Sequence, residues 1–340
     1  MATAVATTAV GSATRKSTQG VAAGRSLSVR ARATDVSRPA GRDDAIASFG
    51  KRDLLVFLTS TPLILLASPA TASVTSIDFT ALQKEATTAY ETADFNRSYR
   101  ALTTLCVEDA GNRDKWLEGR AQVGVDLKKF EQSIEDYAEL LSRVDPINDA
   151  GAAARFHAGK ALAYEGLYAW PLALTEYEQT VQLASDGGFV PDPYIVNSIG
   201  NCYASLGNWG EAREQYLESY SLFQTSKGFR QGASTTQRLD GAVYASANAA
   251  LAAAQLGNEE VAEREMRGVA RRAPNSADMR AALAALLYGS GRVAEAEEQW
   301  EQACARNVGC GRYKDLDYVR RIRRWPPVMV DKLDAFLKIK

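Results

Sequence analysis

Small side chains recur along this chain at a spacing that restricts its fold more than any other feature. Six consecutive units start near Phe79, Asp114, Ala154, Pro193, Val243 and Ala277. Each unit has a small residue at its eighth and its twentieth position, and the two series are Ala86, Ala121, Ala161, Gly200, Ala250, Ala284 and Ser98, Ser133, Ala173, Ala212, Ala262, Ala296. A large residue follows four positions later: Leu102, Tyr137, Tyr177, Tyr216, Met266 and Trp300. Small residues at fixed points of a chain rich in Ala, Leu, Glu and Gln predict helices that pack in close pairs.

The fourth unit carries the clearest pattern. It reads IGNCYASLGNW over residues 199–209, with Ala212 and Tyr216 further on. This pattern resembles the tetratricopeptide repeat, a pair of antiparallel helices. The resemblance implies an all-α fold, an α-solenoid of about six helical hairpins over residues 73–310 with a capping helix in residues 311–340. Surplus residues between units are expected in connections, at Asp145–Pro146, Asp186–Gly188 and Ser226 to Asp240.

Residues 1–72 are predicted to be a bipartite targeting peptide. Residues 1–33 hold five basic residues and no acidic one and are rich in Ala, Ser and Thr, which is typical of a plastid transit peptide. Residues 51–72 combine Lys51–Arg52, an apolar run of 14 residues, and Ala70 and Ala72 at the −3 and −1 positions of a signal peptidase site. The run is too short to span a membrane core about 30 Å thick. This order of signals predicts a chain delivered to the thylakoid lumen and starting near Ser73.

Two questions about targeting stay open from the sequence. The KRDLL motif of residues 51–55 resembles a twin-arginine motif with its first Arg replaced by Lys, so it does not choose the translocase. If the apolar run is not cleaved, the protein would instead be a stromal or membrane-associated repeat adaptor.

Charge and histidine content argue against several classes of function. The whole chain has 40 Lys and Arg against 41 Asp and Glu, and residues 1–72 contribute 9 and 4 of these, so residues 73–340 keep 31 and 37 and a net charge of −6. This balance does not favour a nucleic-acid partner. His157 is the single histidine, and no motif supplies it with a nucleophile, so a structural or surface role is expected. We expect no metal, no cofactor, no small-molecule substrate and no enzymatic activity.

The first helices of a tetratricopeptide array are expected to line its concave face. The fifth positions that hold a cation in carboxylate-binding members are Gln83, Glu118, Ala158, Asn197, Ala247 and Ala281 here, so that mode of binding is disfavoured. The residues predicted to form a hydrogen-bonding groove for an extended peptide or helix are Tyr194, Asn197, Asn201, Tyr244 and Asn248. The alternative is that these side chains are solvated or pack against a neighbouring loop.

Four cysteines are present. Cys304 and Cys310 lie six residues apart across the end of the last unit, where a loop could fold back to allow a disulfide, whereas a buried free thiol is the alternative for each. Cys106 and Cys202 are expected to be core thiols. A rival function is a thiol–disulfide active protein that uses Cys304 and Cys310, although Cys-x-x-Cys spacing is missing.

The C-terminal segment is distinctive and reads YKDLDYVRRIRRWPPVM over residues 313–329. It is similar to the end of plastid tetratricopeptide proteins of plants and green algae that are assigned to the thylakoid lumen. That resemblance implies a non-enzymatic protein–protein interaction scaffold that assists assembly or maintenance of photosynthetic complexes.

Two interpretations of this tail remain. Arg320, Arg321, Arg323, Arg324 and Trp325 could contact an acidic partner or the anionic surface of the thylakoid membrane. Alternatively the segment only caps the array. In that case Leu316, Val319 and Ile322 would seal its end, the arginines would stack on Trp325, and Pro326–Pro327 would stop the helix.

Overall fold

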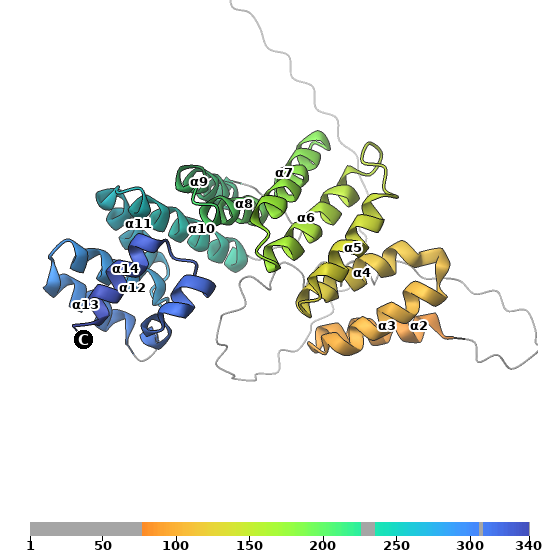
Figure 1. The fold of residues 1–340 in the computed structure, drawn as a ribbon, viewed down its shortest axis with the longest axis horizontal. Coiled ribbons are helices and arrows are strands. Elements are labelled where there is room, and N and C mark those ends of the chain that lie inside the picture. The colour runs from red at the N-terminus through yellow and green to blue at the C-terminus, as the bar shows by residue number, and fades with distance from the viewer. Residues whose placement is uncertain (1–76, 226–234, 306–308, 340) are drawn as a thin grey trace, which may run out of the picture. The chain divides into compact units, whose positions relative to one another are not determined.

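The computed structural model describes residues 77–225, 235–305 and 309–339. The predicted targeting peptide, including Ala70 and Ala72, lies outside the described residues. All regular structure in the described ranges is helical (Figure 1). The α-helices are α2 (Phe79–Glu91), α3 (Phe95–Glu108), α4 (Arg113–Asp126), α5 (Phe130–Leu141), α6 (Ala150–Gly166), α7 (Trp170–Asp186), α8 (Pro193–Ser205), α9 (Trp209–Thr225), α10 (Thr235–Gln255), α11 (Glu259–Arg272), α12 (Asp278–Gly289), α13 (Val293–Ala303) and α14 (Pro327–Leu337).

Consecutive helices from α2 to α13 pack against one another, so the predicted α-solenoid is confirmed. Aspartates start several of these helices. The side chains of Asp78, Asp94, Asp149 and Asp192 each accept a hydrogen bond from a backbone N–H of the first turn. Such caps satisfy donors that the helix itself leaves unpaired.

The small residues found in the sequence lie where the helices of each hairpin approach. All twelve are buried, as are the six large residues that follow four positions after the second series. At Gly200 the contact is close enough to exclude any side chain, because an added Cβ would lie 2.6 Å from the Tyr216 ring and 3.2 Å from the Ala212 carbonyl oxygen. The sequence register is therefore correct in all six units.

Each hairpin turns through one residue in the left-handed backbone region. In the last three units this residue is Gly207, Gly257 or Gly291, whereas the first three units have Ala93, Lys128 and Tyr168, with φ of 60°, 60° and 58°. The residue that follows donates its N–H to a carbonyl five residues back, as Asn208 does to Tyr203 and Lys129 to Gly124. Side-chain-bearing residues adopt this conformation at a cost. The first three units thus lack the turn glycine that the pattern of the fourth unit has at Gly207.

Two boundaries differ from the sequence prediction. α6 starts at Ala150 rather than Ala154, because Asp149 caps it there. α10 starts at Thr235, so the end of the connection predicted for Ser226 to Asp240 is helical.

The tail beyond α13 forms a 3-10 turn at Cys310–Lys314, a π-helical turn at Tyr318–Ile322, and α14. α14 packs beside α12 and α10 (Figure 1). Its inner residues Met329, Leu333 and Phe336 are fully buried, and the Phe336 ring centroid lies 5.5 Å from that of Trp300. The tail therefore covers the apolar end of the last hairpin.

Two details of the predicted cap are wrong. Val319 is fully buried, but Ile322, the last residue of the π-helical turn, is 50% exposed. Pro327 does not stop a helix; it occupies the first turn of α14, where proline has no unpaired N–H to lose.

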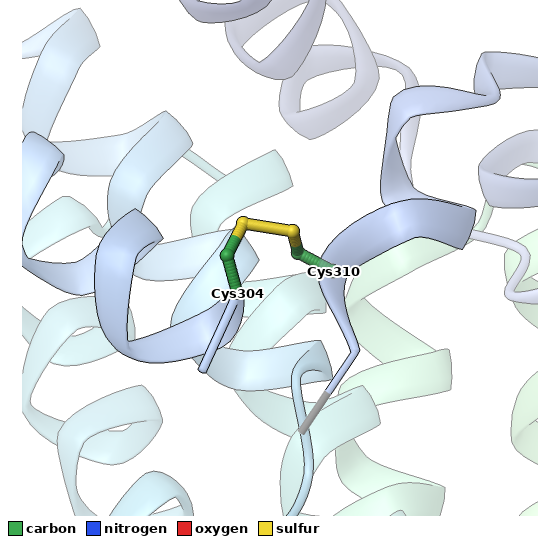
Figure 2. Close-up of a disulfide and its surroundings, with 2 residues drawn as sticks. All are labelled: Cys304 and Cys310. Carbon is green, nitrogen blue, oxygen red and sulfur yellow. A yellow bond between two sulfur atoms is a disulfide. The ribbon is translucent and has the colours of Figure 1, made fainter. Parts of the chain in front are cut away.

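Cys304 and Cys310 form a disulfide (Figure 2). The bond joins the end of α13 to the start of the 3-10 turn, with a Cα–Cα distance of 4.6 Å. It closes a six-residue separation and so fixes where the tail leaves the last hairpin. No helix in the described ranges combines the length and apolar character that a membrane span requires.

Candidate functional site

The predicted groove residues come together on α8 and α10. The Asn248 side-chain amide donates to Asn197 Oδ1 at 3.3 Å, and Tyr216 Oη donates to Asn201 Oδ1 at 3.0 Å. All five predicted residues are partly buried. Tyr194 packs edge-on against Phe223, with ring centroids 4.8 Å apart. Polar side chains of two neighbouring repeats are therefore held in place beside one another, and we call Asn197, Asn201 and Asn248 the asparagine face.

The tail reaches this region through Arg323. Its guanidinium carbon lies 5.6 Å from the ring centroid of Tyr244 on α10. On the other side it forms a bidentate ion pair with Asp278 at the start of α12, in which Nε donates to Oδ1 at 3.1 Å and Nη2 donates to Oδ2. The Asp278 carboxylate also accepts from Trp325 Nε1 at 3.1 Å.

Burial makes this ion pair a structural anchor. The Asp278 side chain is 9% exposed and that of Arg323 is 16% exposed. Tyr313 packs against Trp325, with ring centroids 5.7 Å apart. Burial, and then the nearby Asp278 carboxylate, raise the pKa of Tyr313 well above 10, so its hydroxyl stays protonated. We call Asp278, Tyr313, Arg323 and Trp325 the tail anchor.

The next residue of the tail extends to a different repeat. Arg324 Nη1 donates to Glu165 Oε1 at 2.6 Å, although the two residues are 159 positions apart in sequence. The other carboxylate oxygen of Glu165 accepts from Tyr177 Oη at 3.0 Å. The guanidinium carbon lies 5.0 Å from the ring centroid of Trp170. We call Glu165, Trp170, Tyr177 and Arg324 the tail clasp.

Two further polar contacts run along α14. The backbone N–H of Val328 donates to the Gln255 side chain at 3.0 Å, and Lys332 Nζ lies 2.8 Å from Glu259 Oε1. The tail is thus bonded to α6, α10, α11 and α12.

These contacts change the interpretation of the predicted tail contact. Trp325 is 3% exposed, and Arg323 and Arg324 are bonded to carboxylates of the same chain, so these three residues face inward rather than toward a partner. The arginines lie over Tyr244 and Trp170, not over Trp325 as expected. Arg320 and Arg321 are exposed, and Arg321 pairs with Asp317 across one helical turn.

Sequence reasoning missed Glu165 and Asp278, the two acceptors that hold the tail. A signal for Glu165 was present, because it follows the buried Ala161 by four residues and so lies on the same face of its helix. A carboxylate on a packing face requires a cation or donors. Asp278 stands at the first position of α12 and looks like an ordinary acidic residue of a first helical turn.

His157 takes part in an ion cluster between α6 and α7. Its Nδ1 lies 2.5 Å from Glu176 Oε2, and Lys160 Nζ lies 2.7 Å from Glu176 Oε1. Burial opposes ionisation of Glu176, but the bonds from His157 and Lys160 prevail and lower its pKa below 4.5. Both partners of the carboxylate stand on α6, so the cluster joins the two helices of the third hairpin.

The free cysteines are buried in the core. Burial, with smaller contributions from neighbouring charges, raises the pKa of Cys106 to about 11 and that of Cys202 to about 12. Both therefore stay protonated at neutral pH and are poor nucleophiles. In the part of the chain that the structure describes, no group of three or more His, Cys, Asp or Glu side chains is arranged to hold a metal ion.

No family model and no curated protein matches the chain. The solved structures that match it agree on the fold. Among solved structures, the apo form of RapI gives a TM-score of 0.54 at 13% identity over 77% of this chain and 96% of its own. A tetratricopeptide repeat protein from Parabacteroides merdae gives 0.50 at 14% identity over 76% and 98%. The Cut9–Hcn1 hetero-tetramer of the APC/C gives 0.52 at 14% identity over 86% of this chain and 48% of the matched chain. The chain has the fold of a tetratricopeptide-type α-solenoid.

Proposed function

We propose that this chain is a non-enzymatic scaffold that binds another protein through the asparagine face. The asparagine face is the observation that carries the proposal. Asn197, Asn201 and Asn248 are partly exposed amides held by neighbouring side chains, and fixed amides suit the backbone groups of an extended segment. One matched chain of similar fold belongs to a hetero-tetramer, Cut9–Hcn1.

The test is capture of partners from thylakoids by the purified chain, with crosslinking and mass spectrometry. Asn197→Ala with Asn248→Ala should reduce capture at least tenfold, because it removes the hydrogen-bonding amides from one patch. The matched control is Gln182→Ala, an exposed amide on α7 that bonds to Asp186 within its own helix. Equal capture by both variants would contradict this site.

We propose that the protein works in the thylakoid lumen, where it assists assembly or maintenance of photosynthetic complexes. Support comes from the order of signals in residues 1–72 and from the Cys304–Cys310 disulfide, since disulfides persist in oxidising compartments. Protease treatment of isolated thylakoids tests the location. A lumenal protein survives until detergent is added, whereas a stromal or membrane-associated adaptor is digested at once.

A thiol–disulfide function for Cys304 and Cys310 is the rival. The disulfide joins one exposed and one buried cysteine, so a single sulfur could meet a substrate. Catalytic turnover in an insulin-reduction assay that is lost in Cys310→Ser would replace the scaffold proposal. Absence of turnover leaves the disulfide as a tie between α13 and the tail.

A further inference from the structure

The tail clasp is built differently from the tail anchor beside it. The anchor ties the tail to α12, where α14 already covers the apolar end of the last hairpin. The clasp instead takes one side chain, Arg324, to a carboxylate on α6. The Glu165 side chain is 5% exposed, whereas that of Arg324 is 27% exposed, so the acceptor is buried and the cation that covers it is partly exposed.

The buried Glu165 carboxylate requires a cationic partner, but that partner does not have to be Arg324. Glu165 receives one hydrogen bond from Tyr177 and one from Arg324, and a buried carboxylate without a cation is costly. Burial works against the charge of Arg324, and the Glu165 carboxylate nevertheless raises its pKa, so the guanidinium stays protonated. An arginine also suits the flat face of Trp170 better than a lysine does.

Two residues with positive φ lie at the tail clasp. Arg324 has φ of 51°, and Tyr168, at the turn between α6 and α7, has φ of 58°. The Tyr168 ring packs edge-on against Trp170, with centroids 5.7 Å apart, and the residue is 66% exposed. The first two repeats have Ala93 and Lys128 at the equivalent turn position, so the positive φ belongs to the hairpin turn. An exposed ring that lies against Trp170 is particular to the third repeat.

Apolar surface adjoins the cation site. Tyr168, whose ring lies edge-on against Trp170, is 66% exposed, and Leu167, next to it in sequence, is 37% exposed. The site therefore offers a buried carboxylate, the face of Trp170 and an exposed aromatic ring beside it. Its complement is a protein segment that presents an arginine next to an apolar residue. The net charge of −6 in residues 73–340 attracts such a basic segment at long range.

We propose that the Glu165 carboxylate is a binding site for an arginine side chain of a protein partner, and that Arg324 occupies this site in the free chain. A partner's arginine displaces Arg324 and releases the tail from α6, while the tail anchor keeps the tail on α12. This inference rests on the proposed scaffold function and names the chemistry of its partner.

A labelled peptide of the chain's own sequence, Ile322 to Pro327, is the probe. By fluorescence polarisation at low salt, the Arg324→Met chain should bind it at least tenfold more tightly than the wild-type chain, because its site is vacant. A peptide with methionine at position 324 should not bind, and neither should the double variant Arg324→Met, Glu165→Met, which removes both charges. Tyr168→Ala in the Arg324→Met background should weaken binding.

Lower stability of Arg324→Met does not prevent the test. In that case the arginine peptide should raise the melting temperature of the variant and the methionine peptide should not. On the wild-type chain, excess arginine peptide should speed amide hydrogen exchange at Tyr318 to Trp325. Equal binding by wild-type and Arg324→Met chains, or no effect of the peptide in either measurement, would overturn the proposal. Capture of thylakoid partners through Asn197 and Asn248 would then still stand, so the two proposals fail separately.

Discussion

Close approach at single residues decides much of the helix packing, and Gly200 is a case in which both an aromatic ring and a backbone carbonyl lie close. Gly200→Ala should destabilise the protein by about 1–3 kcal/mol, because the new methyl group must displace the Tyr216 ring or the Ala212 backbone. Gly268→Ala is the control, since it is also helical but has nothing within 4 Å, and it should stabilise by up to about 1 kcal/mol. Urea denaturation of both variants measures the difference, and shifts of the same sign would contradict the packing argument.

The Glu176 cluster gives a pH dependence at the same scale. Because its pKa is lowered in the folded state, Glu176 contributes stability that is complete above the unfolded value of about 4.5 and is lost as the pH falls through the folded value. Glu176→Gln should therefore lower the melting temperature at pH 7, and the difference from wild type should shrink as the pH falls below about 4.5. Thermal melts across this range check it. A difference that grows on acidification would show that the ion cluster does not act as described.

At the scale of helices and turns, the sequence predicted the architecture well because the repeat imposes the same steric demand six times. The small positions at Ala86 and Ala296 could be found without coordinates, since each must admit a neighbouring helix. The starts of α6 and α10 could not, because caps and long connections depend on local contacts that no repeat pattern encodes. The pairing of Glu165 with Arg324 was also out of reach, because it joins the third repeat to the tail, 159 positions away.

A hairpin turn that carries a residue other than glycine can be changed so that the protein becomes more stable. Lys128 is exposed and has φ of 60°, so Lys128→Gly should remove strain at the α4–α5 turn and stabilise the protein by about 0.5–1 kcal/mol. Gly207→Ala, at the equivalent turn between α8 and α9, should destabilise by about 1 kcal/mol. Melting temperatures of the two variants should move in opposite directions. A destabilising Lys128→Gly would mean that this side chain does more than occupy the turn.

At the scale of the whole molecule, we expect the four tail arginines to form two pairs that differ in their effect on stability. Arg320→Gln with Arg321→Gln removes two exposed charges and should fold as wild type, whereas Arg323→Gln with Arg324→Gln leaves Asp278 and Glu165 without cations and should cost about 3–5 kcal/mol or more. If the exposed pair contacts anionic lipid or an acidic partner, its variant should lose salt-sensitive sedimentation with thylakoid membranes. Unchanged sedimentation at low salt would rule out that contact.

Cooperativity of unfolding is the second whole-molecule prediction. The tail clasp joins α6 to the C-terminal end, so repeats three to six should unfold together, while α2 to α5 should open at lower free energy. Arg324→Met should divide the single transition of repeats three to six into steps. Hydrogen exchange at increasing denaturant follows these transitions helix by helix. One transition for all helices in both proteins would contradict this division.

The clasp also places a condition on the order of folding. Closing a loop of 159 residues in a disordered chain costs entropy that grows with the logarithm of its length, about 4–5 kcal/mol from this term alone. Once the intervening hairpins have stacked, the same two residues are already near each other and the cost has been met by that stacking. The bond between Arg324 and Glu165 therefore forms last, after synthesis of the C-terminal segment and after every repeat between them is in place. Formation of this ion pair therefore depends on complete folding, because a chain with a misfolded internal repeat cannot bring Arg324 to Glu165.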